Sequence, residues 1–158
     1  MDPFLAAART TFRQQQRAFE TVIAGLPADA LDWQPSRDAN SLTVLVTHAW
    51  GAAQAWTVRA AGREMARDRA AEFRAKADAA ALQTLLAEGG ARIEAALEAI
   101  DPATLGSIRF NRLGASQPSS DDVYTGAQCV LHAVEHAQEH LGQAYLTRQL
   151  WEAQHPVG

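Results

Sequence analysis

Cysteine is nearly absent from this sequence, which holds a single one, Cys129, in 158 residues. One cysteine forms no disulfide within its chain, and the sequence has no Cys-x-x-Cys pair for a thiolate zinc site or a redox centre. We therefore expect a protein of the reducing cytoplasm. Cys129 itself is interpreted as a small buried apolar residue, because a nucleophilic thiol needs a nearby base and a lowered pKa.

Excess positive charge and long apolar runs are also missing. The 14 basic residues are outnumbered by 18 acidic ones, giving a net charge of −4, so no basic field favours nucleic acid or an anionic membrane. No apolar run approaches the roughly 20 residues of a membrane span, and the first residues lack the pattern of a secretory signal. Nucleophile-elbow, P-loop and dinucleotide-binding glycine motifs are absent as well. We expect a small-molecule substrate, with neither nucleic acid nor membrane as a partner.

Alanine is abundant, with 34 residues in a chain that is 47% hydrophobic. Alanine is the best helix former and is depleted in strands, which indicates an all-α fold. The length is that of one domain, so we predict a single helical domain over residues 1–158.

Four stretches carry apolar residues at the period of a helix, at about residues 3–26, 41–61, 78–100 and 121–151. Asp2 and Ser41 are suited to cap the first and second. Asp121 or Asp122 is expected to start the last. Gly89 and the glycine after it predict a kink or close packing in the third. Together the stretches predict a four-helix bundle, a fold that places ligand and metal sites on side chains facing each other across its interior.

Three connections join these stretches. Residues 29–40 are predicted to hold one helical turn. Residues 62–78 carry charges of mixed sign and are interpreted as a solvated connection with some helix, long enough to cross between two parallel helices. Residues 101–121 form a connection whose length favours a lid or binding role over a passive loop.

Three of the five histidines, His132, His136 and His140, lie four residues apart in the last helix. Residues at this spacing share a helix face, so His136 and His140 can present two imidazoles to one divalent ion. A third ligand must come from another element. His48, close to the apolar stripe of the second helix, is the only other histidine apart from His155. On spacing alone, solvated or core histidines remain the more frequent alternative.

The string from His136 to His140 also matches the His-x-x-Glu-His motif of inverted zinc peptidases, as does the string from His132 to His136. We reject this interpretation. Those peptidases are large α+β proteins that draw a further glutamate ligand from well downstream, and Glu152 is the only acidic residue after His140.

Three groups of residues, in order along almost the whole chain, resemble the signatures of the DinB-like superfamily, which also takes in mycothiol-dependent maleylpyruvate isomerases and bacillithiol transferases. These groups are Leu26-Pro27 with Leu31-Asp32-Trp33-Gln34-Pro35; Asn40-Ser41-Leu42 followed by Val46-Thr47-His48-Ala49-Trp50-Gly51; and His132-x3-His136-x3-His140-Leu141-Gly142-Gln143. The sequence departs from the pattern at Leu141, where a basic residue often precedes the glycine. The likeness lies in the ordered set, since each motif alone is loose.

The resemblance implies that His48, His136 and His140 bind a divalent metal ion, most often zinc or nickel. It also implies an up-down-down-up bundle, which suits the long 62–78 connection, and a homodimer. Three neutral imidazoles add no negative charge, so the ion keeps its Lewis acidity and an open coordination position.

The group at that open position would decide the activity. A low-molecular-weight thiol, as co-substrate, suits transfer or thiol-assisted isomerisation, whereas water suits a hydrolase. We predict a metal-dependent enzyme of the thiol-dependent S-transferase or isomerase type. The alternatives are a metal-dependent hydrolase and a non-catalytic metal-binding, stress-response helical dimer.

Further residues are predicted around the ligands. Those placed to orient or pack the imidazoles are His132, Glu135, Glu139 and Gln143; for the two glutamates a solvated helix face is the more frequent alternative. Those assigned to a substrate pocket are Trp50, Tyr124 and Arg112, with a core role as the alternative for Trp50. Arg109, in the same connection as Arg112, could also meet an anionic substrate.

Overall fold

The structure is a computed structural model and describes residues 2–110 and 123–156. Its long helices confirm the predicted four-helix bundle. None of the helices in these two ranges is both long and apolar enough to cross a membrane. The four are α1 (Pro3–Ile23), α3 (Leu42–Ala60), α5 (Ala79–Glu98) and α6 (Gly126–Gln154).

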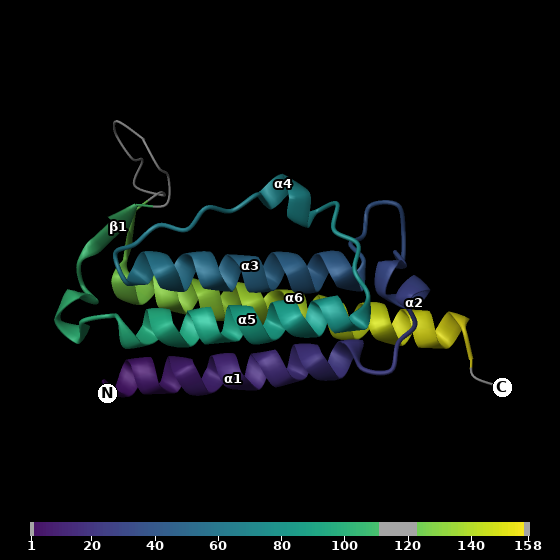
Figure 1. Cartoon of the computed structure of the whole chain (residues 1–158), viewed down its shortest axis with the longest axis horizontal. Coiled ribbons are helices and arrows are strands. Elements are labelled where there is room, and N and C mark those ends of the chain that lie inside the picture. The colour runs from purple at the N-terminus through teal and green to yellow at the C-terminus, as the bar shows by residue number, and fades with distance from the viewer. Residues whose placement is uncertain (1, 111–122, 157–158) are drawn as a thin grey trace.

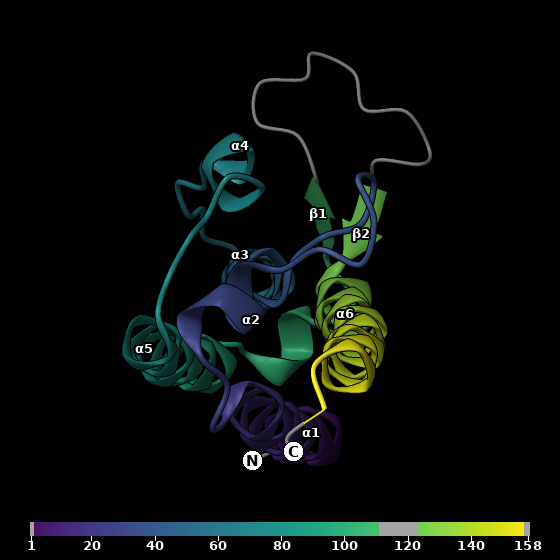
Figure 2. The ribbon, with the colours of Figure 1, turned by 90° about the vertical axis from the view of Figure 1, so that its right-hand side faces the viewer.

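The four helices stand at the corners of a square when viewed along the bundle (Figure 2). Helices α1 and α6 run in one direction and α3 and α5 in the other, the predicted up-down-down-up order (Figure 1). Helix α3 packs against α5 and α6, and α1 packs against the same two helices. Because α3 and α5 are parallel, the chain must return along the bundle between them. The connection that does so holds a short helix, α4 (Arg69–Glu72), over the outer side of α3.

Side-chain caps fix where the long helices begin. The Oδ1 atom of Asp2 accepts hydrogen bonds from the first backbone amides of α1, and Ser41 caps α3 as predicted. Thr125 caps α6 in a capping box with Gln128, which satisfies two backbone amides reciprocally. The prediction that Asp121 or its neighbour starts this helix is therefore wrong, because α6 begins at Gly126 and Val123 and Tyr124 before its cap are extended.

These extended residues form a small sheet that the sequence analysis did not predict. Strand β1 (Ile108–Phe110) pairs antiparallel with β2 (Val123–Thr125), with Arg109 opposite Tyr124. A 3-10 turn, η1 (Pro102–Thr104), precedes β1. Between α1 and α3 lies α2 (Ala28–Asp32), the single helical turn expected there.

Helix α5 runs unbroken through Gly89, where the predicted close packing is confirmed. A Cβ atom at Gly89 would lie 2.5 Å from Cδ1 of Trp50. The fully buried Trp50 indole donates from Nε1 to the Leu86 carbonyl oxygen at 3.0 Å and meets Phe19 edge to face. Because Gly89 has no side chain, α5 approaches α3 closely at Trp50, which lies two residues after His48.

Candidate metal centre

The packing of α3 against α6 brings three histidines together. His48 comes from α3, and His136 and His140 come from successive turns of α6. The ring centroid of His48 lies 5.1 Å from those of His136 and His140, which are 4.5 Å from each other. One ring nitrogen from each of the three residues lies within 4.8 Å of the others. This cluster could hold one metal ion.

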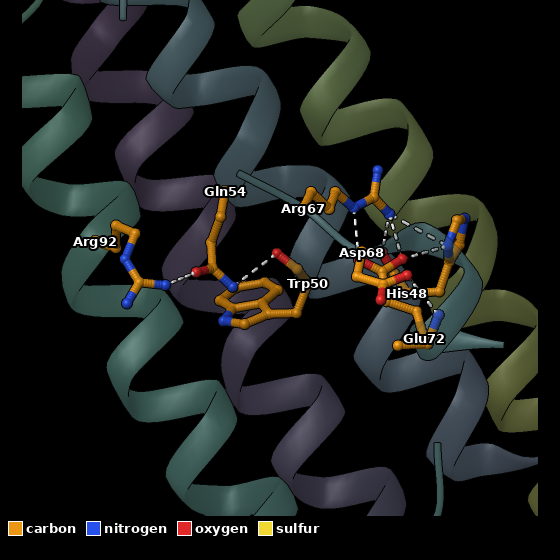
Figure 3. A network of polar contacts seen from close by, with 8 residues as sticks. His48, Trp50, Gln54, Arg67, Asp68, Glu72 and Arg92 are labelled. Atoms are coloured by element: carbon orange, nitrogen blue, oxygen red, sulfur yellow. Dashed lines mark hydrogen bonds and ion pairs between the residues drawn. The ribbon is translucent and has the colours of Figure 1, made fainter. Parts of the chain in front are cut away.

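Glu72, from α4, fixes the imidazole of His48. Its Oε2 atom lies 3.0 Å from His48 Nδ1, and both side chains are buried (Figure 3). Arg67 Nη2, which can only donate, also lies 3.2 Å from Nδ1, but the Glu72 contact is shorter. An ionised carboxylate only accepts hydrogen bonds, so the Glu72 contact favours the tautomer with the proton on Nδ1. The other ring nitrogen of His48, Nε2, then presents a lone pair, as a metal ligand must.

Arg67 holds the Glu72 carboxylate in turn. Its Nε and Nη2 atoms lie 2.6 and 2.7 Å from the two carboxylate oxygens, and Nη2 also donates to the His48 carbonyl oxygen at 3.1 Å (Figure 3). Gly51 permits the close approach of Glu72, because a Cβ there would lie 2.7 Å from Oε1. The 62–78 connection holds some helix, as predicted, but it is not solvated at these two residues, because Glu72 is buried and Arg67 is half-buried.

The two histidines of α6 differ in their partners. His140 Nδ1 lies 2.9 Å from Oε1 of Gln143, so the predicted role of Gln143 agrees with its position. His136 Nδ1 is buried and has no hydrogen-bond partner among the described residues. A buried polar atom without a partner costs about 1–3 kcal/mol. A metal ion bound through this nitrogen would give it the partner that the described residues do not supply. Three imidazole nitrogens within 4.8 Å of one another are a donor set that fits a divalent ion.

The surroundings lower the pKa of two of the three imidazoles, those of His136 and His48. Burial, and then the positive charges of the neighbouring histidines and Arg67, lowers the pKa of His136 to about 4. Burial also lowers the pKa of His48, against the raising effect of its hydrogen bond to Glu72. Metal binding requires unprotonated imidazole, and these shifts remove proton competition at neutral pH.

His132, one turn before His136, lies beside the cluster rather than in it. Its ring centroid is 4.4 Å from that of Trp56 and 5.9 Å from that of His136. Glu135 and Glu139 are exposed on α6, and none of the hydrogen bonds among the described residues joins them to a histidine. The orienting role predicted for these glutamates is taken by Glu72 and Gln143.

A cavity of about 300 Å³ opens next to the cluster. Trp50 is not part of its wall, and the pocket role predicted for Trp50 is wrong because its indole is directed into the core. Tyr124 lies beside the wall, its ring 4.9 Å from that of Trp56. Arg112 lies outside the described residues, whereas Arg109 lies near Gly62. The cavity is lined by His48, Ala52, Trp56, Arg67, Arg69, His132 and His136.

Cys129 is fully buried, as expected. Burial raises the pKa of its thiol to about 11, so the thiol stays protonated at neutral pH. The chain's only cysteine is therefore not suited to act as a nucleophile.

Neither Glu72 nor Arg67 was predicted from the sequence. Both lie in a stretch of mixed charge with no apolar periodicity, and nothing in that pattern separates a buried carboxylate from its solvated neighbours. The only local hint is Gly51, one turn of α3 beyond His48, where a small residue leaves room for another chain segment.

Replacing Glu72 with glutamine should weaken zinc binding about 10- to 100-fold, because the neutral amide holds the His48 ring less firmly and lowers its basicity. A competition titration with a chromophoric chelator measures the effect. Glu64→Gln, which removes an exposed carboxylate of the same connection, is the matched control. Equal zinc affinity in both variants would contradict the role of Glu72.

The family model for the DinB superfamily matches residues 11–144. A search of curated proteins finds no match. A conserved protein from Enterococcus faecalis has a similar solved structure, with a TM-score of 0.71 and 20% sequence identity, over 95% of this chain and 97% of that one. A DinB-like protein from Bacillus subtilis superposes with a TM-score of 0.66 and 14% identity, over 90% of each chain.

A third similar structure is that of a mutant of the mycothiol-dependent maleylpyruvate isomerase. It has a TM-score of 0.63 and 12% identity, over 90% of this chain and 62% of the isomerase chain. At these identities the structural matches bear on the fold alone.

Proposed function

This chain belongs to the DinB superfamily, and from that membership we propose that it is a divalent-metal-dependent enzyme of the thiol-dependent S-transferase or isomerase type. The observation that carries the proposal is the histidine cluster, in which a buried nitrogen of His136 lacks a partner among the described residues. The cluster borders a cavity large enough for a small substrate.

His48, His136 and His140 would hold the ion. Imidazole ligands admit zinc, nickel, iron or copper, and of these we propose zinc or nickel. When bound, such an ion supplies Lewis acidity that lowers the pKa of a thiol or a water molecule beside it. Glu72 keeps the proton on Nδ1 of His48 and so maintains the ring in its ligating form.

The nucleophilic thiol would come from a separate small molecule. Cys129 does not provide it, because its thiol is buried and its pKa is raised to about 11. The fold similarity to a mycothiol-dependent maleylpyruvate isomerase is consistent with thiol chemistry in this bundle. In this scheme Trp56 and Ala52 exclude water from one side of the cavity.

Thiol transfer to chlorodinitrobenzene tests the proposal. In this reaction the sulfur–carbon bond forms, chloride leaves with the electron pair of the broken carbon–chlorine bond, and the thiol proton passes to the buffer. A free thiol is only a few per cent ionised at pH 7, so full ionisation alone would raise the rate about thirtyfold. We expect that rise with the zinc- or nickel-loaded protein and one thiol of a panel that includes mycothiol, bacillithiol and cysteine.

The matched control is His136→Ala, prepared and metal-loaded in the same way. Loss of the rate in this variant and on chelation supports the proposal. A rate that survives chelation contradicts it, as does a metal-loaded protein that accelerates no thiol in the panel. Ester hydrolysis without any thiol would replace the proposal with a metal-dependent hydrolase.

A further inference from the structure

The cavity beside the histidine cluster has a positive wall and no acidic side chain among its lining residues. Arg67 and Arg69, both from the connection that crosses α3, form this wall. Glu72 pairs with Arg67 and neutralises one of the two charges, but it does not line the cavity. The wall therefore keeps about one net positive charge before any metal ion is added.

Each arginine retains capacity for a ligand. Arg67 uses Nε and Nη2 for Glu72 and His48, while its Nη1 takes part in none of the hydrogen bonds among the described residues. Arg69 is exposed, and its guanidinium carbon lies 5.6 Å from the centre of the Phe73 ring. It forms no ion pair within residues 2–110 and 123–156. A guanidinium so placed can pair with a carboxylate or a phosphate.

Aromatic and small side chains also line the cavity. These are Trp56, Ala52 and His132, and the rings of Trp56 and His132 are in contact. At about 300 Å³ the cavity is at the lower end of the range for small-molecule sites. A cationic substrate would meet like charge there, and a fully polar one would leave the aromatic side unused.

Resting on the proposed function, we infer that the substrate is a small organic anion with an apolar body. Its carboxylate or phosphate would pair with Arg69 and with Nη1 of Arg67, and its body would lie against Trp56, beside the metal ligands His48 and His136. A bound divalent ion would add to the attraction. The two arginines, which come from a connection rather than from the bundle helices, would set this charge preference.

The test is an NMR titration with benzoate, phenyl phosphate and the neutral benzamide, on metal-free and zinc-loaded protein. We expect at least one of the two anions to bind about tenfold more tightly than benzamide in the metal-free protein, where no ion can ligate the carboxylate. Arg69→Gln should remove most of this preference. Arg74→Gln, which removes an exposed arginine of the same connection that does not line the cavity, should leave it unchanged.

Equal affinity for the anions and for benzamide would overturn the inference. An equal preference for the anions in the Arg69→Gln and Arg74→Gln variants would overturn it as well. Failure of the proposed function looks different. If Arg69-dependent anion binding occurs but zinc does not bind, the anion subsite stands and the metal-dependent function falls. If thiol transfer is metal-dependent but Arg69→Gln changes nothing, the function stands and the subsite falls.

Discussion

His136→Ala is expected to lower zinc affinity about 100- to 1000-fold. Structural zinc sites with four ligands have apparent binding free energies of about 10–16 kcal/mol, so one ligand contributes about 2.5–4 kcal/mol. His136 is the ring whose buried nitrogen has no alternative partner among the described residues, and its low pKa spares it proton competition. Alanine is well tolerated in a helix such as α6, so the variant should fold.

Competition with a chromophoric chelator measures this loss, and circular dichroism checks the fold. His132→Ala and His155→Ala are the matched controls, the first from the same face of α6 and the second from its C-terminal end. Both should keep zinc affinity within about tenfold of the parent chain. If His132→Ala loses as much affinity as His136→Ala, the ligand set differs from the three residues assigned here.

Gly89→Ala is expected to destabilise the protein by about 1–2 kcal/mol, although the same change in an exposed helix stabilises by about 1 kcal/mol. The added Cβ would lie 2.5 Å from Cδ1 of Trp50 and 2.6 Å from Nε2 of Gln54. Trp50 is fully buried and held by its hydrogen bond to Leu86, so it cannot move aside cheaply. Relief of the clash would separate α3 from α5.

Gly142→Ala is the matched control, because Gly142 lies in α6 with no atom within 4 Å of an added Cβ. It should stabilise the chain by about 1 kcal/mol. Urea unfolding of both variants, compared at equal m-values, gives the two free energies. Stabilisation by both substitutions would show that α3 and α5 do not pack as closely at Gly89 as described.

Prediction from the sequence worked best where all the residues concerned lie in one helix. Histidines four residues apart share a face of any α-helix, so His136 and His140 could be paired from spacing alone. The third ligand could not be derived in this way, because the faces on which α3 and α6 meet depend on how the whole bundle packs. His48 was assigned from the ordered family motifs, and the structure places it beside the other two.

Three features escaped prediction for identifiable physical reasons. Glu72 is buried only because the 62–78 connection folds back onto α3 at Gly51, which no local pattern encodes. The strands of the small sheet have three residues each, too few to establish an alternating pattern. Trp50 was assigned to the pocket, but its indole reaches the Leu86 carbonyl of α5 and belongs to the core.

Anomalous diffraction at the zinc absorption edge, from crystals of the full chain loaded with one equivalent of zinc, tests the central claim most directly. The account predicts one strong anomalous peak between α3 and α6, about 2.0–2.1 Å from one nitrogen of each of His48, His136 and His140. Zinc absent from this cluster, or bound there without His48, would contradict it.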